Sequence, residues 1–187
     1  MRWTETEKKL TVYPSFVLFV CVLLWLDKGH FAALFLISAG LHECGHLLAL
    51  HLTGVPVCRM ELRASGAVLY TAPATPGKEA VCTVAGPLMN LLLLSVCFRC
   101  CPTAALVNLI LLVYNLLPIY PLDGGRLLRT ALSVLFGEQK AERLSELFSV
   151  LLTGILVICG VLLTCVFHAG LYPCLIAALF LCKLKKL

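Results

Sequence analysis

Six apolar segments, separated by short polar stretches, constrain the fold of this chain more than any other feature. A helix needs about 20 apolar residues to cross a bilayer. Hydrophobic residues make up 60% of the 187 residues and charged residues 13%, against roughly 45–50% and about 25% in a soluble domain. One soluble core of this size cannot bury so much apolar surface. We therefore predict an all-α, polytopic protein of the lipid bilayer with about six transmembrane helices, over Val12–Leu26, Phe31–Leu52, Glu79–Phe98, Thr103–Leu122, Leu147–Phe167 and Ala169–Cys182.

Basic side chains indicate how these helices are oriented. With the N-terminus inside the cell, thirteen of the 15 Lys and Arg residues fall in inside segments, and Lys28 and Arg99 fall in outside turns. The positive-inside rule then places both termini in the cytoplasm. The net charge of +5 is small and gives no indication of a nucleic-acid partner.

Two polar segments have patterns of their own. Cys58–Ala64 alternates apolar and polar residues, Ser65-Gly66 is a turn signal, and Ala67–Thr71 favours a returning strand. This pattern predicts a small β-hairpin at the cytoplasmic face, with a disordered polar loop as the alternative. The segment Arg126–Glu146 predicts an interfacial helix that breaks near Gly137.

Three ionisable side chains stand inside the second apolar segment, in the sequence "LHECGHL" at residues 41–47. On a helix, His42 and His46 lie about 40° apart around the axis and one turn apart along it. Both imidazoles can then bind one zinc ion, with Glu43 beside it as general base. An ionisable group near the bilayer centre costs on the order of 2.5–3.5 kcal/mol and marks function by default. The alternative is a pair of structural histidines that form hydrogen bonds between helices.

A catalytic zinc takes three protein ligands, and Asp123 is the strongest candidate for the third. Pro118 and Pro121 each remove a helical hydrogen bond, so the fourth helix should loosen there and let Asp123 turn inward. Gly124 and Gly125, which follow, would permit the close approach of another backbone. The alternative is an ordinary aspartate at a helix end or turn.

Three motifs together resemble the site-2 protease family of intramembrane zinc metalloproteases. They are His42–His46, the run "AGPLMN" at residues 85–90, and the run "NLLPIYPLDGG" at residues 115–125. They occur in the family's order across the second to fourth helices, which implies a three-helix catalytic core over about residues 31–127. The expected fold is therefore a single domain over residues 1–187, without the PDZ or CBS domain of other family members.

The resemblance also implies a role for each motif residue. It assigns zinc (Zn²⁺) to His42, His46 and Asp123, proton transfer to Glu43, and a place close to the active site to Asn115. Amides can both donate and accept hydrogen bonds, which suits contact with a substrate backbone. For Asn90 a functional and a structural role are equally open. Asn108 is expected to form a hydrogen bond between helices.

Within the family, the six-helix plan and the residues 115–126 look most like the sporulation protease, which releases a late sigma factor from its membrane-associated proform. The resemblance implies a membrane-associated protein substrate, cut near the cytoplasmic face of a bacterial cell membrane, and leaves an inhibitory membrane partner open. One alternative is cleavage of an anti-sigma factor or a remnant signal peptide. The other is a non-enzymatic membrane scaffold or a metal transporter.

Overall fold

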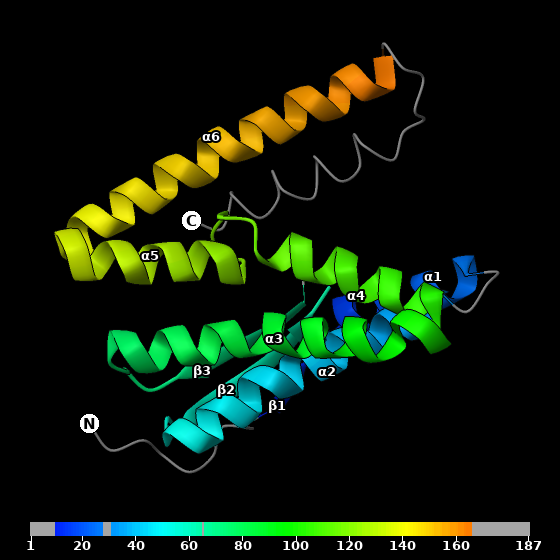
Figure 1. Cartoon of the computed structure of the whole chain (residues 1–187), viewed down its shortest axis with the longest axis horizontal. Coiled ribbons are helices and arrows are strands. Elements are labelled where there is room, and N and C mark those ends of the chain that lie inside the picture. The colour runs from blue at the N-terminus through cyan, green and yellow to red at the C-terminus, as the bar shows by residue number, and fades with distance from the viewer. Residues whose placement is uncertain (1–9, 28–30, 65, 166–187) are drawn as a thin grey trace. The chain divides into compact units, whose positions relative to one another are not determined.

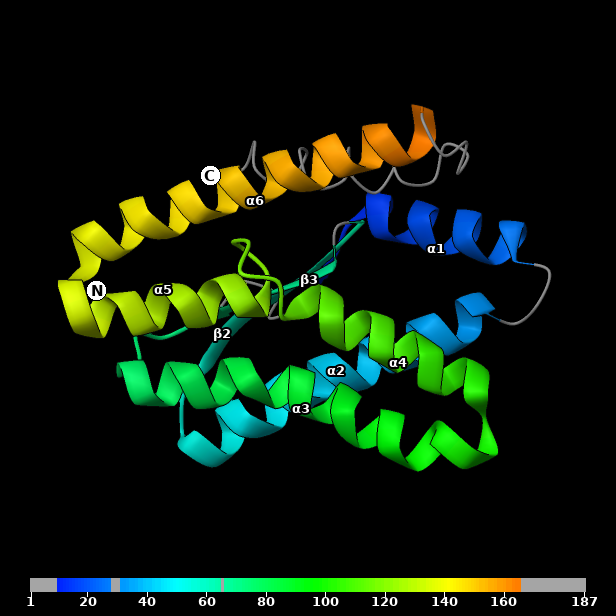
Figure 2. The same cartoon turned by 45° about the horizontal axis from the view of Figure 1, so that its top comes forward.

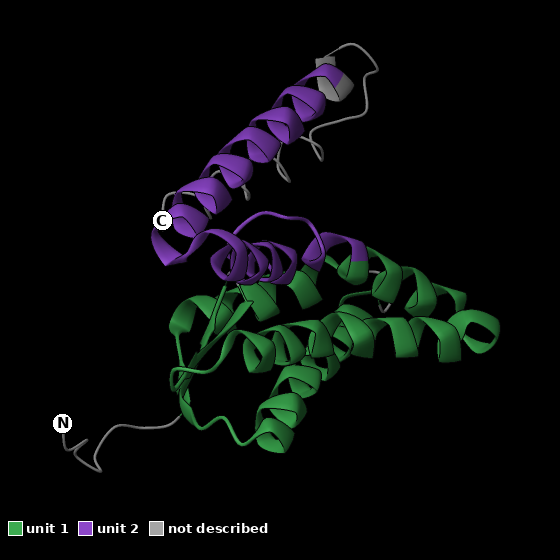
Figure 3. Ribbon diagram, turned by 60° about the vertical axis from the view of Figure 1, so that its left-hand side comes forward, with its two compact units in different colours: residues 1–112 green, residues 113–187 purple. Residues whose placement is uncertain are grey.

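The computed structural model describes residues 10–27, 31–64 and 66–165 of the chain. The chain divides into two compact units, residues 1–112 and residues 113–187 (Figure 3). The elements shown in Figure 1 are, in chain order, β1 (Leu10–Val12), α1 (Pro14–Leu26), α2 (Phe31–Thr53), β2 (Val57–Arg63), β3 (Gly66–Thr71), α3 (Pro76–Cys100), α4 (Pro102–Asn115), α5 (Asp123–Phe136) and α6 (Glu138–Cys165).

Three of the described helices are long and apolar enough to cross a membrane: α2, α3 and the stretch Glu138–Leu162 of α6. The apolar helices α1 and α4 are shorter, at 13 and 14 residues. The predicted helical architecture is thus confirmed, whereas six membrane crossings are not. The expected sixth segment, Ala169–Cys182, lies outside the described residues.

The sequence pattern predicted one helix over the fourth apolar segment, through to Leu122. In the structure this helix ends earlier. α4 ends at Asn115, and residues 116–122 form an irregular loop that contains a cis peptide bond between Tyr120 and Pro121. Pro118 and Pro121 have no backbone N–H to donate, so a regular helix cannot continue through them. Helical structure resumes at Asp123, which therefore begins α5 instead of ending the preceding helix.

The predicted hairpin forms the larger part of a three-stranded sheet with the order β1-β2-β3. β3 pairs antiparallel with β2, with Arg63 opposite Gly66, and β1 pairs parallel with β2, with Leu10 opposite Met60. The sequence pattern does not predict β1, because a three-residue strand that pairs with a distant segment leaves no local period. The first helix accordingly begins at Pro14 and not at Val12.

A buried carboxylate ties the start of α1 to this sheet. The side chain of Glu61 in β2 is 3% exposed and forms ion pairs with Arg59 at 2.8 Å and with Arg63 at 2.6 Å. The hydrogen bonds that Arg63 donates to Glu61 raise the pKa of its guanidinium above the ordinary value. That guanidinium also lies 4.7 Å from the ring centroid of Tyr13, the N-cap residue of α1. The backbone N–H of Tyr13 donates to the backbone oxygen of Leu62.

α2 and α3 pack side by side in the first unit (Figures 1 and 2). Gly45 allows the two backbones to approach closely, because a Cβ there would lie 2.7 Å from the backbone oxygen of Ala85 and 3.1 Å from Met89 Cβ. Small residues let helix backbones approach in this way in membrane proteins. Beneath the sheet, buried residues of α2, α3 and the α2–β2 connection form an apolar core: Ala49, Leu50, Val55 and Cys82.

α4 is also held to α2 by a polar contact. The Asn108 Nδ2 donates to Ser38 Oγ at 3.0 Å and to the backbone oxygen of Ala104 at 2.9 Å, and both side chains are buried. This contact confirms the expected helix–helix hydrogen bond of Asn108. It satisfies the donor end of this buried amide, whereas its Oδ1 has no hydrogen-bond partner among the described residues.

In the second unit, α5 and α6 pack against each other and are joined at Gly137. Gly137 has φ 81° and ψ 161°, a backbone conformation that residues with a Cβ rarely adopt. Its N–H donates the last helical hydrogen bond of α5, to the Ser133 backbone oxygen, and its positive φ ends the helix there. The predicted helix break near Gly137 is therefore confirmed.

Gly137→Ala should lower the free energy of unfolding by about 1–3 kcal/mol, because its backbone conformation is strained for any residue with a Cβ. Gly154→Ala in α6 is the matched control. At both positions no described atom lies within 4 Å of an added Cβ, but Gly154 lies inside a helix without a positive φ. Alanine should therefore stabilise that helix by about 1 kcal/mol. Thermal unfolding of the purified variants in detergent measures both changes, and equal midpoints would contradict the prediction.

Candidate metal centre

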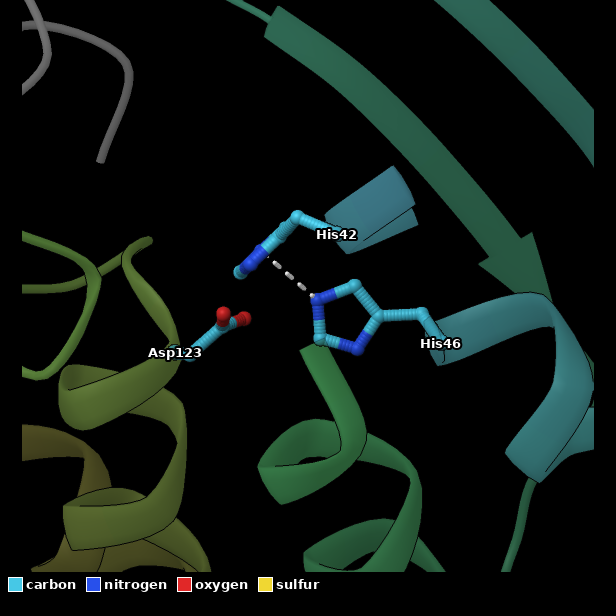
Figure 4. Close-up of side chains that lie close together, drawn as sticks. All are labelled: His42, His46 and Asp123. Atoms are coloured by element: carbon cyan, nitrogen blue, oxygen red, sulfur yellow. Dashed lines mark hydrogen bonds between the residues drawn. The ribbon is translucent and has the colours of Figure 1, made fainter. Parts of the chain in front are cut away.

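Two buried imidazoles one helical turn apart form the centre of the site. His42 and His46 lie on the face of α2 that packs on α3 and are 5% and 6% exposed. Their Nε2 atoms are 3.1 Å apart, and their ring planes cross at 86° (Figure 4). The helical period therefore brings two metal-ligating nitrogens to one point, as the sequence spacing predicts.

The other nitrogen of each ring is held by α3. The His46 Nδ1 lies 2.8 Å from the backbone oxygen of Cys82. Because a carbonyl oxygen accepts only, this nitrogen carries the proton and leaves Nε2 of the neutral ring with its lone pair. The His42 Nδ1 lies 3.0 Å from the side-chain amide of Asn90. Such partners orient histidines that bind metal ions.

Gly86 allows α3 to approach both rings. A Cβ at this position would overlap His46 Nε2 and would lie 2.7 Å from His42 Cε1. Gly86 itself is buried and lies between Cys82 and Asn90 on α3. Any larger residue would occupy the space beside the paired Nε2 atoms.

The geometry of the histidine pair fits a zinc ion. Two nitrogens bound at about 2.0–2.1 Å to a tetrahedral zinc are about 3.3 Å apart, and the Nε2 atoms of His42 and His46 are separated by 3.1 Å. Imidazole nitrogen and carboxylate oxygen are both zinc ligands. The histidine pair of the first unit therefore offers two of the ligands that such an ion needs.

Asp123 stands at the start of α5 in the second unit, and its side chain is buried. The two glycines that follow let the irregular loop pack directly on this helix start. A Cβ on Gly124 would lie 2.6 Å from the Leu117 backbone oxygen, and one on Gly125 would lie 2.5 Å from that of Ile119. The close backbone approach predicted for these glycines is confirmed.

Ser149 of α6 holds the same loop, and sequence reasoning missed it. The Tyr120 N–H donates to Ser149 Oγ at 2.9 Å, and the Ser149 hydroxyl donates to the Ser145 backbone oxygen at 2.7 Å. A signal was present, because small residues recur every fourth position on α6 and are all buried, namely Ala141, Ser145, Ser149 and Thr153. Buried polar groups in an apolar helix call for a partner.

The structure also gives the position and burial of the other candidate residues, Glu43, Asn115 and Asn90. Glu43 follows His42 on α2 and is half-buried, and Asn115 is the last residue of α4 and is also half-buried. Their assigned roles stay predictions. Asn90, for which two roles were open, is fully buried beside His42.

A family match and two similar curated proteins agree on one family of peptidases. Residues 97–159, which include Asp123 but not the histidine pair, match Peptidase family M50. A zinc metalloprotease of Methanocaldococcus jannaschii is 30% identical over 173 residues, covering 82% of this chain and 51% of that protein. Stage IV sporulation protein FB of Bacillus subtilis is 31% identical over 159 residues, covering 77% of this chain and 54% of that protein. The chain thus spans about half the length of the curated relatives it matches.

A solved structure extends the similarity over nearly the whole chain. The site-2 protease from Methanocaldococcus jannaschii matches with a TM-score of 0.74 and 25% sequence identity. The match covers 95% of this chain and 89% of that chain. It thus extends well beyond residues 97–159, the range of the family match.

Gly86→Ala should weaken zinc binding at least about tenfold, because the added methyl group would displace the two imidazoles, and displaced supporting contacts typically cost that much. The control is Gly40→Ala on α2, where an added Cβ meets no described atom within 4 Å. Zinc affinity of the purified variants, measured by competition with a chromogenic chelator, distinguishes them. Wild-type affinity in Gly86→Ala would show that the close approach of α3 is not needed.

Proposed function

Since the chain belongs to peptidase family M50, the family of the site-2 proteases, we propose that it is an intramembrane zinc endopeptidase that cleaves a membrane-associated protein near the cytoplasmic face of a bacterial membrane. The observation that carries this proposal is the buried histidine pair on an apolar helix, with both Nε2 atoms directed to one point. Ionisable rings at membrane depth are costly to bury and mark a functional site by default.

In this proposal Asp123 is the third zinc ligand. The proposal is supported by the burial of His42, His46 and Asp123 and by the resemblance of residues 115–125 to the family motif that supplies the aspartate. Two imidazoles and one carboxylate are a ligand set of catalytic zinc sites, which keep a fourth position open for water or substrate. Three apolar helices long enough to span a membrane support a site at membrane depth.

The chain's own residues then carry the proton transfers. A zinc ion in the site would lower the pKa of its water toward about 7. Glu43, which adjoins the ligand His42 on α2, accepts the proton of the attacking water and delivers it to the leaving amine. The Asn115 amide donates a hydrogen bond to the substrate carbonyl and stabilises the charge that develops there.

A peptide bond inside a transmembrane helix is covered by the helix's own hydrogen bonds, so the substrate must unwind before it can react. β3 offers a place for the unwound segment, because it is an edge of the described sheet. Extended peptides add to such edges through backbone hydrogen bonds. In a hairpin with a two-residue loop, the residues that flank the loop form a hydrogen-bonded pair. Arg63 and Gly66 are that pair, so the alternation directs the Leu69 N–H to the open side of β3.

The sporulation proform of a sigma factor is the substrate that we propose. The proposal is supported by the 31% identity with stage IV sporulation protein FB and by the resemblance of residues 115–126. Co-expression with a membrane-tethered sigma proform should give a smaller product that is absent with Glu43→Gln. A product from an anti-sigma factor or a remnant signal peptide instead would change the substrate and keep the chemistry. No product from any of them would favour a non-enzymatic protein.

Glu43→Gln should separate chemistry from metal binding. Glutamine has nearly the shape of glutamate but cannot accept the proton, so cleavage should fall by at least about 10²–10⁴-fold, the loss typical of a missing general base. The zinc content should stay near one ion per chain. Asp123→Asn should differ, because an amide is a poor zinc ligand, and it should lower zinc content together with cleavage.

The paired measurement is zinc content by elemental analysis against cleavage rate for both variants. Zinc loss in Glu43→Gln, with normal zinc and cleavage in Asp123→Asn, would mean that the two roles have been exchanged. The assignment would then be abandoned.

Leu69→Pro should impair cleavage more than zinc binding, because proline removes an N–H from the open side of β3. Leu69 also packs partly against the apolar core of the first unit, so Leu69→Ala is the control for lost packing. We expect cleavage by Leu69→Pro to be at least about tenfold slower than by Leu69→Ala, the cost of a hydrogen bond of about 1.4 kcal/mol. Equal rates for the two variants, at equal expression, would argue against strand addition.

A further inference from the structure

Asn90 is fully buried in the middle of α3 beside the first histidine of the site. Its side chain is 0% exposed, and its Nδ2 lies 3.0 Å from His42 Nδ1. The Oδ1 at the other end of the amide is also buried, and no described group forms a hydrogen bond with it. The hydrogen bond with His42 Nδ1 is therefore what links the Asn90 side chain to the site.

Asn108 shows what a structural amide looks like in the same unit. It is equally buried, at 1% exposed, and its Nδ2 donates to Ser38 Oγ and to the Ala104 backbone oxygen. Both partners are ordinary helix contacts, and neither is a candidate ligand. Asn90 differs because its partner is a ring nitrogen of a residue that the proposed site uses.

The chemistry of the pair follows from the two ends of the amide. One end of a side-chain amide donates and the other accepts, and the two ends have nearly the same shape. When His42 Nε2 holds a metal ion, the ring's proton sits on Nδ1, which then needs an acceptor. A half-turn of the Asn90 amide exchanges Nδ2 for Oδ1 at the same place, and Oδ1 gives up no other described bond to do so.

We propose that Asn90 is a positioning residue for the metal ligand His42. It fixes the plane of the imidazole so that Nε2 points to His46, and its Oδ1 accepts the Nδ1 proton when the ion is bound. Cys82 does the same for His46 through its backbone oxygen, which no side-chain substitution removes. The inference rests on the proposed function in one respect, that His42 is a zinc ligand.

The test is the zinc dissociation constant of the full-length chain, purified in detergent and measured by competition with a chelator, together with the thermal midpoint of each sample. Asn90→Leu, which has no acceptor, should bind zinc about 10–100-fold more weakly, the usual loss when such a partner is removed. Asn90→Asp keeps an acceptor at the same place and should bind zinc within about threefold of wild type or more tightly. Asn108→Leu controls for the loss of a buried amide, and should lower the thermal midpoint while leaving zinc affinity within about threefold.

Three results would overturn the inference while leaving the proposed function intact. The first is wild-type affinity in Asn90→Leu, and the second is an equal loss in Asn108→Leu and Asn90→Leu. The third is a loss in Asn90→Asp as large as that in Asn90→Leu, and the Asp variant also decides the matter if the Leu variant does not fold. An absence of zinc binding in the wild-type chain would overturn the proposed function itself.

Discussion

The close approach of α3 to α2 is the contact on which the site depends. Gly45 lets the two backbones meet, and Gly86 leaves room for the imidazoles of His42 and His46 at the same level. Cys82 and Asn90, one turn to either side of Gly86, reach the remaining ring nitrogens. In lipid there is little hydrophobic force between helices, so association relies on such close packing and on polar contacts. The same contact therefore supplies both the packing and the orientation of the histidines.

The second unit fixes its carboxylate by different means, because Asp123 is placed by the path of the chain and not by a helical period. Prolines end α4, and the glycines after Asp123 let the loop lie against the start of α5. Ile119 and Leu122 bury their side chains against α6, and Ser149 binds the loop backbone. A polar side chain that binds one backbone group thus holds an irregular segment inside an apolar protein.

How much the sequence could predict depended on whether a feature was local. The histidine spacing, the turn at Ser65-Gly66 and the break at Gly137 are local patterns, and the structure contains the helix, hairpin and break that they predict. β1 pairs with a strand about 50 residues away, and a partner at that distance leaves no mark on three residues. The end of α4 at Asn115 was missed because the residues between Asn115 and Asp123 are mostly apolar and continue the hydrophobic run. The role of Asn90 stayed open and Ser149 was missed, because a polar residue in an apolar run does not identify its partner.

The tie between the sheet and the first helix has a mechanical consequence. β1 leads into α1 through Tyr13, whose N–H is bound to Leu62 and whose ring is covered by Arg63, itself paired with the buried Glu61. The connection between β1 and α1 is a single residue, Tyr13, and its contacts are too many for it to act as a hinge. A displacement of the sheet would therefore carry the start of α1 with it, so the sheet and the first helix should move as one body.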